Sequence, residues 1–173
     1  MVQIVPEDRF LALIEGIIRR EGGVVRLPDG PGGQYQETRF GQTPGWLADF
    51  GLPVPNTIAD AALNYETWLR KTHLADLCYP PDSLAEQVID FAVHSGAATA
   101  IKHLQALVEV EQDGRLGPKT LAAVAYHTDR QYLARRLFRR RCQFLGKVLQ
   151  DPHKAARFAE GWLDRLGQMA ERL

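Results

Sequence analysis

Apolar residues recur at helical spacing along most of the chain. Near the amino terminus they form one stripe, at positions Phe10, Leu11, Leu13, Ile14, Ile17 and Ile18. This stripe predicts an amphipathic helix that starts near Pro6 and ends at Gly22, because proline favours the first turn of a helix and glycine its end. Glu21 lies four residues after Ile17, so we expect its side chain to lean towards the apolar face.

The segment that follows breaks this pattern. Residues 24–55 contain five prolines and six glycines, which disfavour continuous helix and predict a long loop or a small hairpin region. Helical spacing then returns over 58–77, 82–95, 97–108, 118–126, 129–149 and 152–170. The alternation of β-branched residues typical of a large sheet is absent. We therefore expect a mainly α fold.

Composition is that of an ordinary globular protein. The 173 residues are 45% hydrophobic and 24% charged, which suffices for one domain with a substantial core. Lys plus Arg and Asp plus Glu number 21 each, so net charge does not favour binding to nucleic acid. Neither a Sec signal nor a run of about eighteen apolar residues is found, so we expect no export signal and no membrane insertion.

Cysteine and histidine spacing indicates no metal site. Cys78 and Cys142 stand alone, and we favour two thiols over the alternative of one disulfide. The five histidines form no zinc-binding pattern, so neither a metal nor another cofactor is expected.

A cluster of arginines is predicted on one helix. Arg135, Arg136, Arg139, Arg140 and Arg141 make a basic face at helical spacing. We favour a solvated face paired with nearby acids, because mixed surface charge is common. Attraction to an anionic wall or envelope is the alternative, and a nucleic-acid binder is disfavoured by the zero net charge.

Glu21 is the candidate general acid. Apolar surroundings and the negative end of the helix dipole both favour its protonated carboxyl. Gly22 and Gly23 end the helix and let a ligand approach the backbone closely. An ordinary helix end is the structural alternative.

Three residues of the loop region are candidates for the second group that glycoside hydrolysis needs, a carboxylate or a positioned water. They are Asp29, Glu37 and Thr38. Each has a simpler explanation, because Asp29 lies in a common turn, Glu37 suits a solvated surface and Thr38 suits a turn cap. Trp46 is suited to stacking on a sugar ring, although aromatic residues more often belong to the core.

An ordered series of motifs resembles glycoside hydrolase family 108. This family contains phage and bacterial N-acetylmuramidases, some of which were first labelled secretion activators. The amino-terminal matches are Glu21-Gly22-Gly23, Pro31-Gly32-Gly33 and Glu37-Thr38-Arg39-Phe40-Gly41-x-Thr43. The matches to the associated peptidoglycan-binding region are Asp90-Phe91-Ala92-Val93-His94-Ser95-Gly96, Asp113-Gly114-x-x-Gly117-Pro118-x-Thr120 and Phe158-x-x-Gly161-Trp162. Departures include Gln42 for a usual isoleucine and His94 for a usual asparagine.

The resemblance implies a lysozyme-like helical fold and cleavage of the β-1,4 bond between N-acetylmuramic acid and N-acetylglucosamine. Glu21 would be the acid, with Asp29, Glu37 and Thr38 as further catalytic candidates. Substrate contacts are expected from Gly22, Gly23, Phe40, Trp46, Asp90 and His94. The alternatives are a lytic transglycosylase and a non-catalytic module that binds the cell wall.

The resemblance also implies a division of the chain and a setting. Residues 1–88 would form the muramidase region and 89–173 the peptidoglycan-binding region, both packed as one compact domain. We expect a monomer that is made in the cytoplasm and reaches the periplasmic wall through holin release, virion delivery or specialised secretion. A holin or an immunity protein would then be a further partner.

Overall fold

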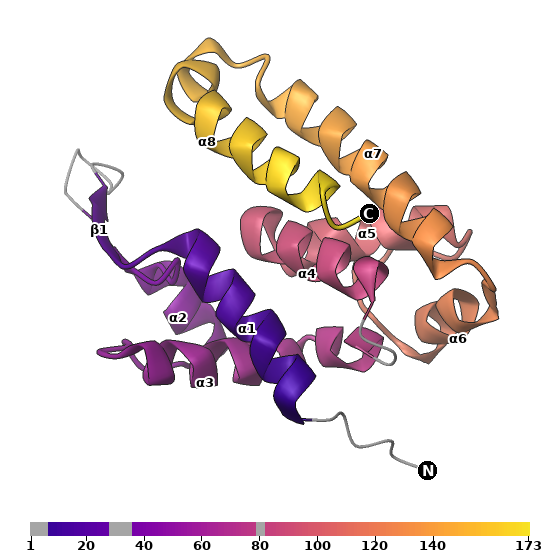
Figure 1. The fold of residues 1–173 in the computed structure, drawn as a ribbon, viewed down its shortest axis with the longest axis horizontal. Helices are drawn as coiled ribbons and strands as arrows, with labels where there is room; N and C mark the ends of the chain where they lie inside the picture. Colours follow the sequence, from indigo (N-terminus) through magenta and orange to yellow (C-terminus); the bar gives the residue numbers. More distant parts are fainter. Residues whose placement is uncertain (1–6, 28–35, 79–81) are drawn as a thin grey trace. The chain divides into compact units, whose positions relative to one another are not determined.

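The computed structural model describes residues 7–27, 36–78 and 82–173 (Figure 1). These residues are mainly helical, and the strands among them form one antiparallel pair. The mainly α, lysozyme-like fold expected from the sequence is confirmed, with a small hairpin after the first helix. The chain divides into two compact units, Met1–Lys71 and Thr72–Leu173. The boundary between the two units therefore lies after Lys71, whereas the sequence placed the boundary between the muramidase and peptidoglycan-binding regions after residue 88.

The first unit is built around two helices that pack on each other. Its elements are α1 (Glu7–Glu21), β1 (Val24–Leu27), β2 (Gln36–Arg39), α2 (Pro44–Phe50) and α3 (Ile58–Lys71). Helix α1 contacts α3 and contributes the buried residues Ile14, Ile17 and Ile18 of the expected stripe. Helix α3 buries Ala61, Tyr65 and Trp68, which recur at helical spacing. The core of this unit lies between these two faces.

Helix α2 lies inside the segment that was expected to be loop. The Thr43 hydroxyl accepts a hydrogen bond from the Trp46 amide at 3.2 Å, and Pro44 occupies the first helical position. Gly51 ends the helix with φ at 60°. Suitable capping residues at both ends therefore allow a short helix to form within a region rich in glycine and proline.

The regular elements among the described residues of the second unit are all helices. It comprises η2 (Leu74–Cys78), α4 (Ser83–Ser95), α5 (Ala97–Leu107), α6 (Pro118–Tyr126), α7 (Arg130–Val148) and α8 (Pro152–Ala170). Helix α4 is its core element, because α4 contacts both α5 and α7 and is buried along most of its length. Helices α7 and α8 run side by side (Figure 1).

The two cysteines are free thiols. Cys78 is buried and Cys142 half-buried. Burial raises the pKa of Cys78 to about 11 and also raises the pKa of Cys142.

No helix among the described residues is long and apolar enough to cross a bilayer.

Candidate functional site

Glu21 is the last residue of α1, and its side chain is half-buried. The chain leaves the helix at Gly22, whose φ is 74°, and the Gly22 amide donates to the carbonyl of Ile18 at 3.1 Å. The expected helix end at Gly22 is therefore confirmed. Gly23 follows as an exposed residue and leads directly into β1.

The hairpin brings the segment after β2 next to the end of α1. Val24 pairs with Arg39 and Val25 with Thr38. The Phe40 amide extends this pairing by donating to the carbonyl of Gly23 at 2.9 Å. Phe40 thus lies beside the glycines that follow Glu21.

Residues Arg39–Gln42 form a tight turn with positive φ at both central positions. The φ angles are 52° at Phe40 and 77° at Gly41, and the Gln42 amide donates to the Arg39 carbonyl at 2.9 Å. This is the φ pattern of a type I′ turn, and the left-handed conformation costs a residue with a Cβ about 1–2 kcal/mol. The Tyr65 hydroxyl donates to the Phe40 carbonyl at 2.8 Å and helps to hold the turn.

Gly41 packs directly against the side chain of Glu21. A Cβ atom added at Gly41 would lie 2.6 Å from both Cγ and Oε2 of Glu21. Only a residue without a side chain fits between the turn and this carboxyl. The turn therefore limits where the Glu21 side chain can lie at the junction of α1 and the hairpin.

A buried polar network attaches the turn to α3. Gln42 is 1% exposed, and its side-chain amide donates to the Ala61 carbonyl at 2.9 Å. Asn64 donates to Gln42 Oε1 and to the Pro53 carbonyl, both at 2.8 Å. Sequence reasoning missed this role, because it noted Gln42 only as a departure from isoleucine.

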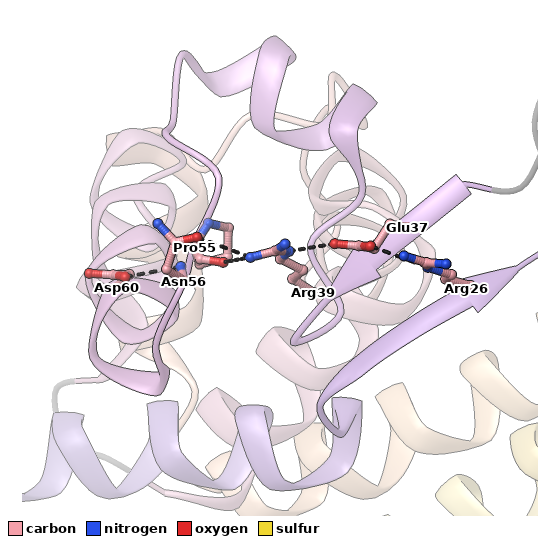
Figure 2. A network of polar contacts seen from close by, with 6 residues as sticks. All are labelled: Arg26, Glu37, Arg39, Pro55, Asn56 and Asp60. Atoms are coloured by element: carbon pink, nitrogen blue, oxygen red, sulfur yellow. Dashed lines mark hydrogen bonds and ion pairs between the residues drawn. The ribbon is translucent and has the colours of Figure 1, made fainter.

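Glu37 belongs to a chain of polar contacts that runs from the hairpin towards the start of α3 (Figure 2). Arg39 Nε lies 2.6 Å and Arg26 Nε 3.4 Å from the Glu37 carboxylate. The hydrogen bond from Arg39 and its charge lower the pKa of Glu37. Arg39 also donates to Asn56 Oδ1 at 3.0 Å, and the Asn56 amide donates to Asp60. Figure 2 shows Arg39 between the hairpin and the start of α3.

Thr38 projects from the opposite face of β2, because side chains alternate along a strand and Glu37 shares its face with Arg39. Trp46 packs against Phe50, Tyr65 and Trp68, with ring centroids 5.5, 5.6 and 5.8 Å away. It remains half-buried. Its role in substrate stacking stays a prediction, as do the catalytic roles of Thr38 and Glu37.

Asp90 and His94 belong to a buried network in the second unit. The side chain of Asp90 is 0% exposed, and its Oδ2 atom accepts a hydrogen bond from Arg141 at 2.8 Å. Arg165 donates to both carboxylate oxygens of Asp90, each at 3.0 Å. Arg141 also lies 3.3 Å from His94 Nδ1, and burial together with the two arginines lowers the pKa of His94 to about 4. His94 packs edge-on against the ring of Trp162 at 5.1 Å.

The predicted site residues thus fall into two groups. Glu21, Gly22, Gly23 and Phe40 lie together at the junction of α1 and the hairpin, whereas Asp90 and His94 stabilise the contact of α4 with α7 and α8. Asp29 lies outside the described residues. Within the described part of the chain, no three His, Cys, Asp or Glu side chains gather as a metal would require. Substrate contact by the second group stays a prediction.

Comparisons with known proteins connect the chain to peptidoglycan. Residues 99–167 match a family model described as a predicted peptidoglycan domain. No curated protein matches. Among solved structures, the structure of SagA from Brucella abortus matches with a TM-score of 0.70 and 30% identity, over 96% of this chain and 94% of that one. The chain therefore belongs to the same family as SagA of Brucella abortus, and its second unit carries the predicted peptidoglycan domain.

Proposed function

We propose that this protein is a peptidoglycan hydrolase of the kind found in glycoside hydrolase family 108. It would cleave the β-1,4 bond between N-acetylmuramic acid and N-acetylglucosamine, with Glu21 as general acid. The observation that carries this proposal is the packing of Gly41 against the Glu21 side chain, which restricts one carboxyl to a place beside a glycine-rich segment. Fixed geometry is what a proton donor requires.

The choice of substrate is supported by the comparisons. A predicted peptidoglycan domain occupies residues 99–167, so the chain carries a region suited to the same polymer that the acid would cleave. The match to SagA extends over nearly the whole chain and includes the segment that holds Glu21.

The reaction would proceed by acid catalysis, with a second group among the candidates of the loop region. The protonated Glu21 carboxyl would donate to the leaving glycosidic oxygen while positive charge develops on the sugar. Glu37 would remain ionised, because Arg39 lowers its pKa, so it suits stabilisation of positive charge better than proton donation. Thr38 suits the binding of a water, and Asp29 remains the other candidate for the second carboxylate.

The test is release of muropeptides from purified sacculi by the wild type and by Glu21→Gln. The glutamine keeps the shape of the side chain but has no acidic proton, so the rate should fall by about 100-fold or more. Glu15→Gln is the matched control, since Glu15 lies on the same helix in an exposed ion pair with Arg19. It should release muropeptides at the wild-type rate. Equal rates for wild type and Glu21→Gln would refute the assignment.

Analysis of the products identifies the outcome of cleavage. Hydrolysis leaves reducing N-acetylmuramic acid ends, whereas a lytic transglycosylase leaves anhydromuramic ends. We expect reducing ends. Anhydromuramic ends from a reaction that depends on Glu21 would show that the protein is a lytic transglycosylase and not a hydrolase. Binding to sacculi without any release of muropeptides would instead identify a wall-binding module.

A further inference from the structure

Helix α7 carries an unusual concentration of positive charge. Its 19 residues include seven of the 21 Lys and Arg residues of the chain and none of the 21 Asp and Glu residues. Two of the seven have a structural role, because Arg130 pairs with Asp82 and Arg141 with Asp90. The remaining five are Arg135, Arg136, Arg139, Arg140 and Lys147.

These five cations lie on one face of the helix. At about 100° per residue they fall within one arc of roughly 140°. The positions between them on this arc are Tyr132, Gln143 and Gly146, which are all exposed. The buried residues Leu133, Leu137 and Leu145 lie outside the arc and face the core. We call the five cations with Tyr132 and Gln143 the basic face of α7.

The structure gives this charge no acidic partner. None of the five cations forms an ion pair with any residue that the structure describes. Arg135, Arg136, Arg139 and Lys147 are exposed, and Arg136 lies 5.8 Å from the ring centre of Tyr132. The Nε atom of the half-buried Arg140 has no hydrogen-bond partner among the described residues.

The arrangement opposes helix stability and therefore favours an external partner. Arg135 and Arg139 are four residues apart, as are Arg136 and Arg140, and like charges at this spacing repel each other across one helix turn. Elsewhere the chain places opposite charges at this spacing, as in Glu15 with Arg19 and Glu66 with Arg70. An anionic ligand that bridges the arginines would remove the repulsion.

We propose that the basic face of α7 binds the free carboxylates of the peptide stems of peptidoglycan. All of α7 lies within residues 99–167, the segment that matches the predicted peptidoglycan domain. Glycan strands are neutral apart from their acidic substituents, so the stems supply the negative charge that complements this face. The proposal rests on peptidoglycan as the partner of this protein, and not on Glu21 as its acid.

The experiment measures co-sedimentation with purified sacculi in the cold, where digestion is slow. The test variant is Arg135→Gln/Arg136→Gln/Arg139→Gln. The matched control is Lys102→Gln/Arg115→Gln/Lys119→Gln, which removes three exposed cations from other elements of the same unit. A third variant replaces the same three arginines of α7 by lysine. Each protein is tested on native sacculi and on sacculi whose carboxylates have been amidated.

We expect the α7 glutamine variant to bind native sacculi about tenfold more weakly than the wild type, as suits three screened contacts. The control should bind within about twofold of the wild type, because it lowers the net charge but keeps the basic face of α7. The lysine variant should do so as well, because it keeps the positive charges of that face and changes only the shape of the cationic groups. Amidated sacculi should bind the wild type and the glutamine variant equally weakly.

Three results would overturn the proposal. Equal losses in the glutamine variant and the control would assign the effect to net charge. A tenfold loss that persists on amidated sacculi would exclude the stem carboxylates. Unchanged binding to native sacculi, together with lost retention on DNA or on anionic vesicles, would assign the face to another polymer or to a lipid surface. Muropeptide release by Glu21→Gln is scored separately, so failure of either proposal is visible alone.

Discussion

Gly41 occupies the point where the turn after β2 meets the side chain of Glu21. Its φ of 77° is strained for a residue with a side chain, and a Cβ atom added here would lie 2.6 Å from Glu21 Oε2. A glycine in a turn is usually explained by backbone conformation alone. Here the lack of a side chain also leaves the space that the Glu21 carboxyl fills, so one residue serves both the turn and the candidate site.

Replacement of Gly41 by alanine should therefore impair activity more than stability. We expect Gly41→Ala to lower kcat for release of muropeptides by about tenfold or more, because the new methyl group displaces the Glu21 carboxyl. The free energy of unfolding should fall by only about 1–2 kcal/mol from the left-handed backbone. Kinetics on sacculi and urea denaturation measure the two effects.

Gly45→Ala is the control for this prediction. Gly45 lies near the start of α2, and a Cβ added there meets nothing within 4 Å. The variant should keep wild-type kinetics and unfold at the same or a slightly higher urea concentration. Wild-type kcat in Gly41→Ala would show that the packing of Gly41 does not position the acid.

At the scale of whole elements, Asp90 joins three helices of the second unit. Its carboxylate lies on α4 and binds Arg141 of α7 and Arg165 of α8. The side chains of Asp90 and Arg141 are 0% and 1% exposed. Buried charges of this kind are stable only while every member keeps its partners.

Removal of Asp90 should accordingly destabilise the protein strongly. We expect Asp90→Ala to lower the free energy of unfolding by about 3–5 kcal/mol, since it leaves Arg141 charged and buried without its carboxylate. Asp164→Ala removes an exposed carboxylate from α8 and should change stability by less than about 0.5 kcal/mol. Urea unfolding followed by circular dichroism compares them. Similar midpoints for the two variants would contradict a supporting role for the network.

Sequence patterns predicted these elements well where the signals are local. Ile14, Ile17 and Ile18 marked the buried face of α1, Asp82 the start of α4 and Pro118 the start of α6. Such signals depend only on neighbours along the chain. Helix α2 was missed, because a seven-residue helix holds too few turns to show a periodic stripe.

The polar networks could not be predicted in the same way. Gln42 meets Asn64 across 22 positions of sequence, and Arg165 meets Asp90 across 75. Nothing in the composition of either neighbourhood specifies such a pair. The turn at Phe40 is harder still, because a bulky residue with positive φ opposes local preference and depends on the tertiary contact with Tyr65.

For the molecule as a whole, His94 makes stability depend on pH. The pKa of His94 is about 4 in the folded protein, below its ordinary value of 6.5. Between these values the unfolded chain binds a proton that the folded protein does not, so the contribution of His94 to stability is fully present above pH 6.5 and is lost as the pH falls towards 4. The loss between about pH 7 and pH 5 should be about 1–2 kcal/mol after allowance for partial exposure of the ring.

The variant His94→Asn isolates this contribution. Asparagine can still accept a hydrogen bond from Arg141 but does not titrate, so other groups dominate the remaining pH dependence. Urea unfolding at pH 7 and at pH 5 measures how far the free energy of unfolding falls between these values. The fall should be smaller for the variant than for the wild type by about 1–2 kcal/mol. An identical decrease in both proteins would mean that His94 titrates normally.

The unpaired thiols have a consequence for how the protein can be handled and where it can fold. No covalent cross-link between Cys78 and Cys142 contributes to the fold, so reducing agents should leave the native protein unchanged. With its pKa near 11, Cys78 holds almost no thiolate at neutral pH and should react slowly with alkylating agents and glutathione. Passage between compartments of different redox potential would then leave the core of the second unit unchanged.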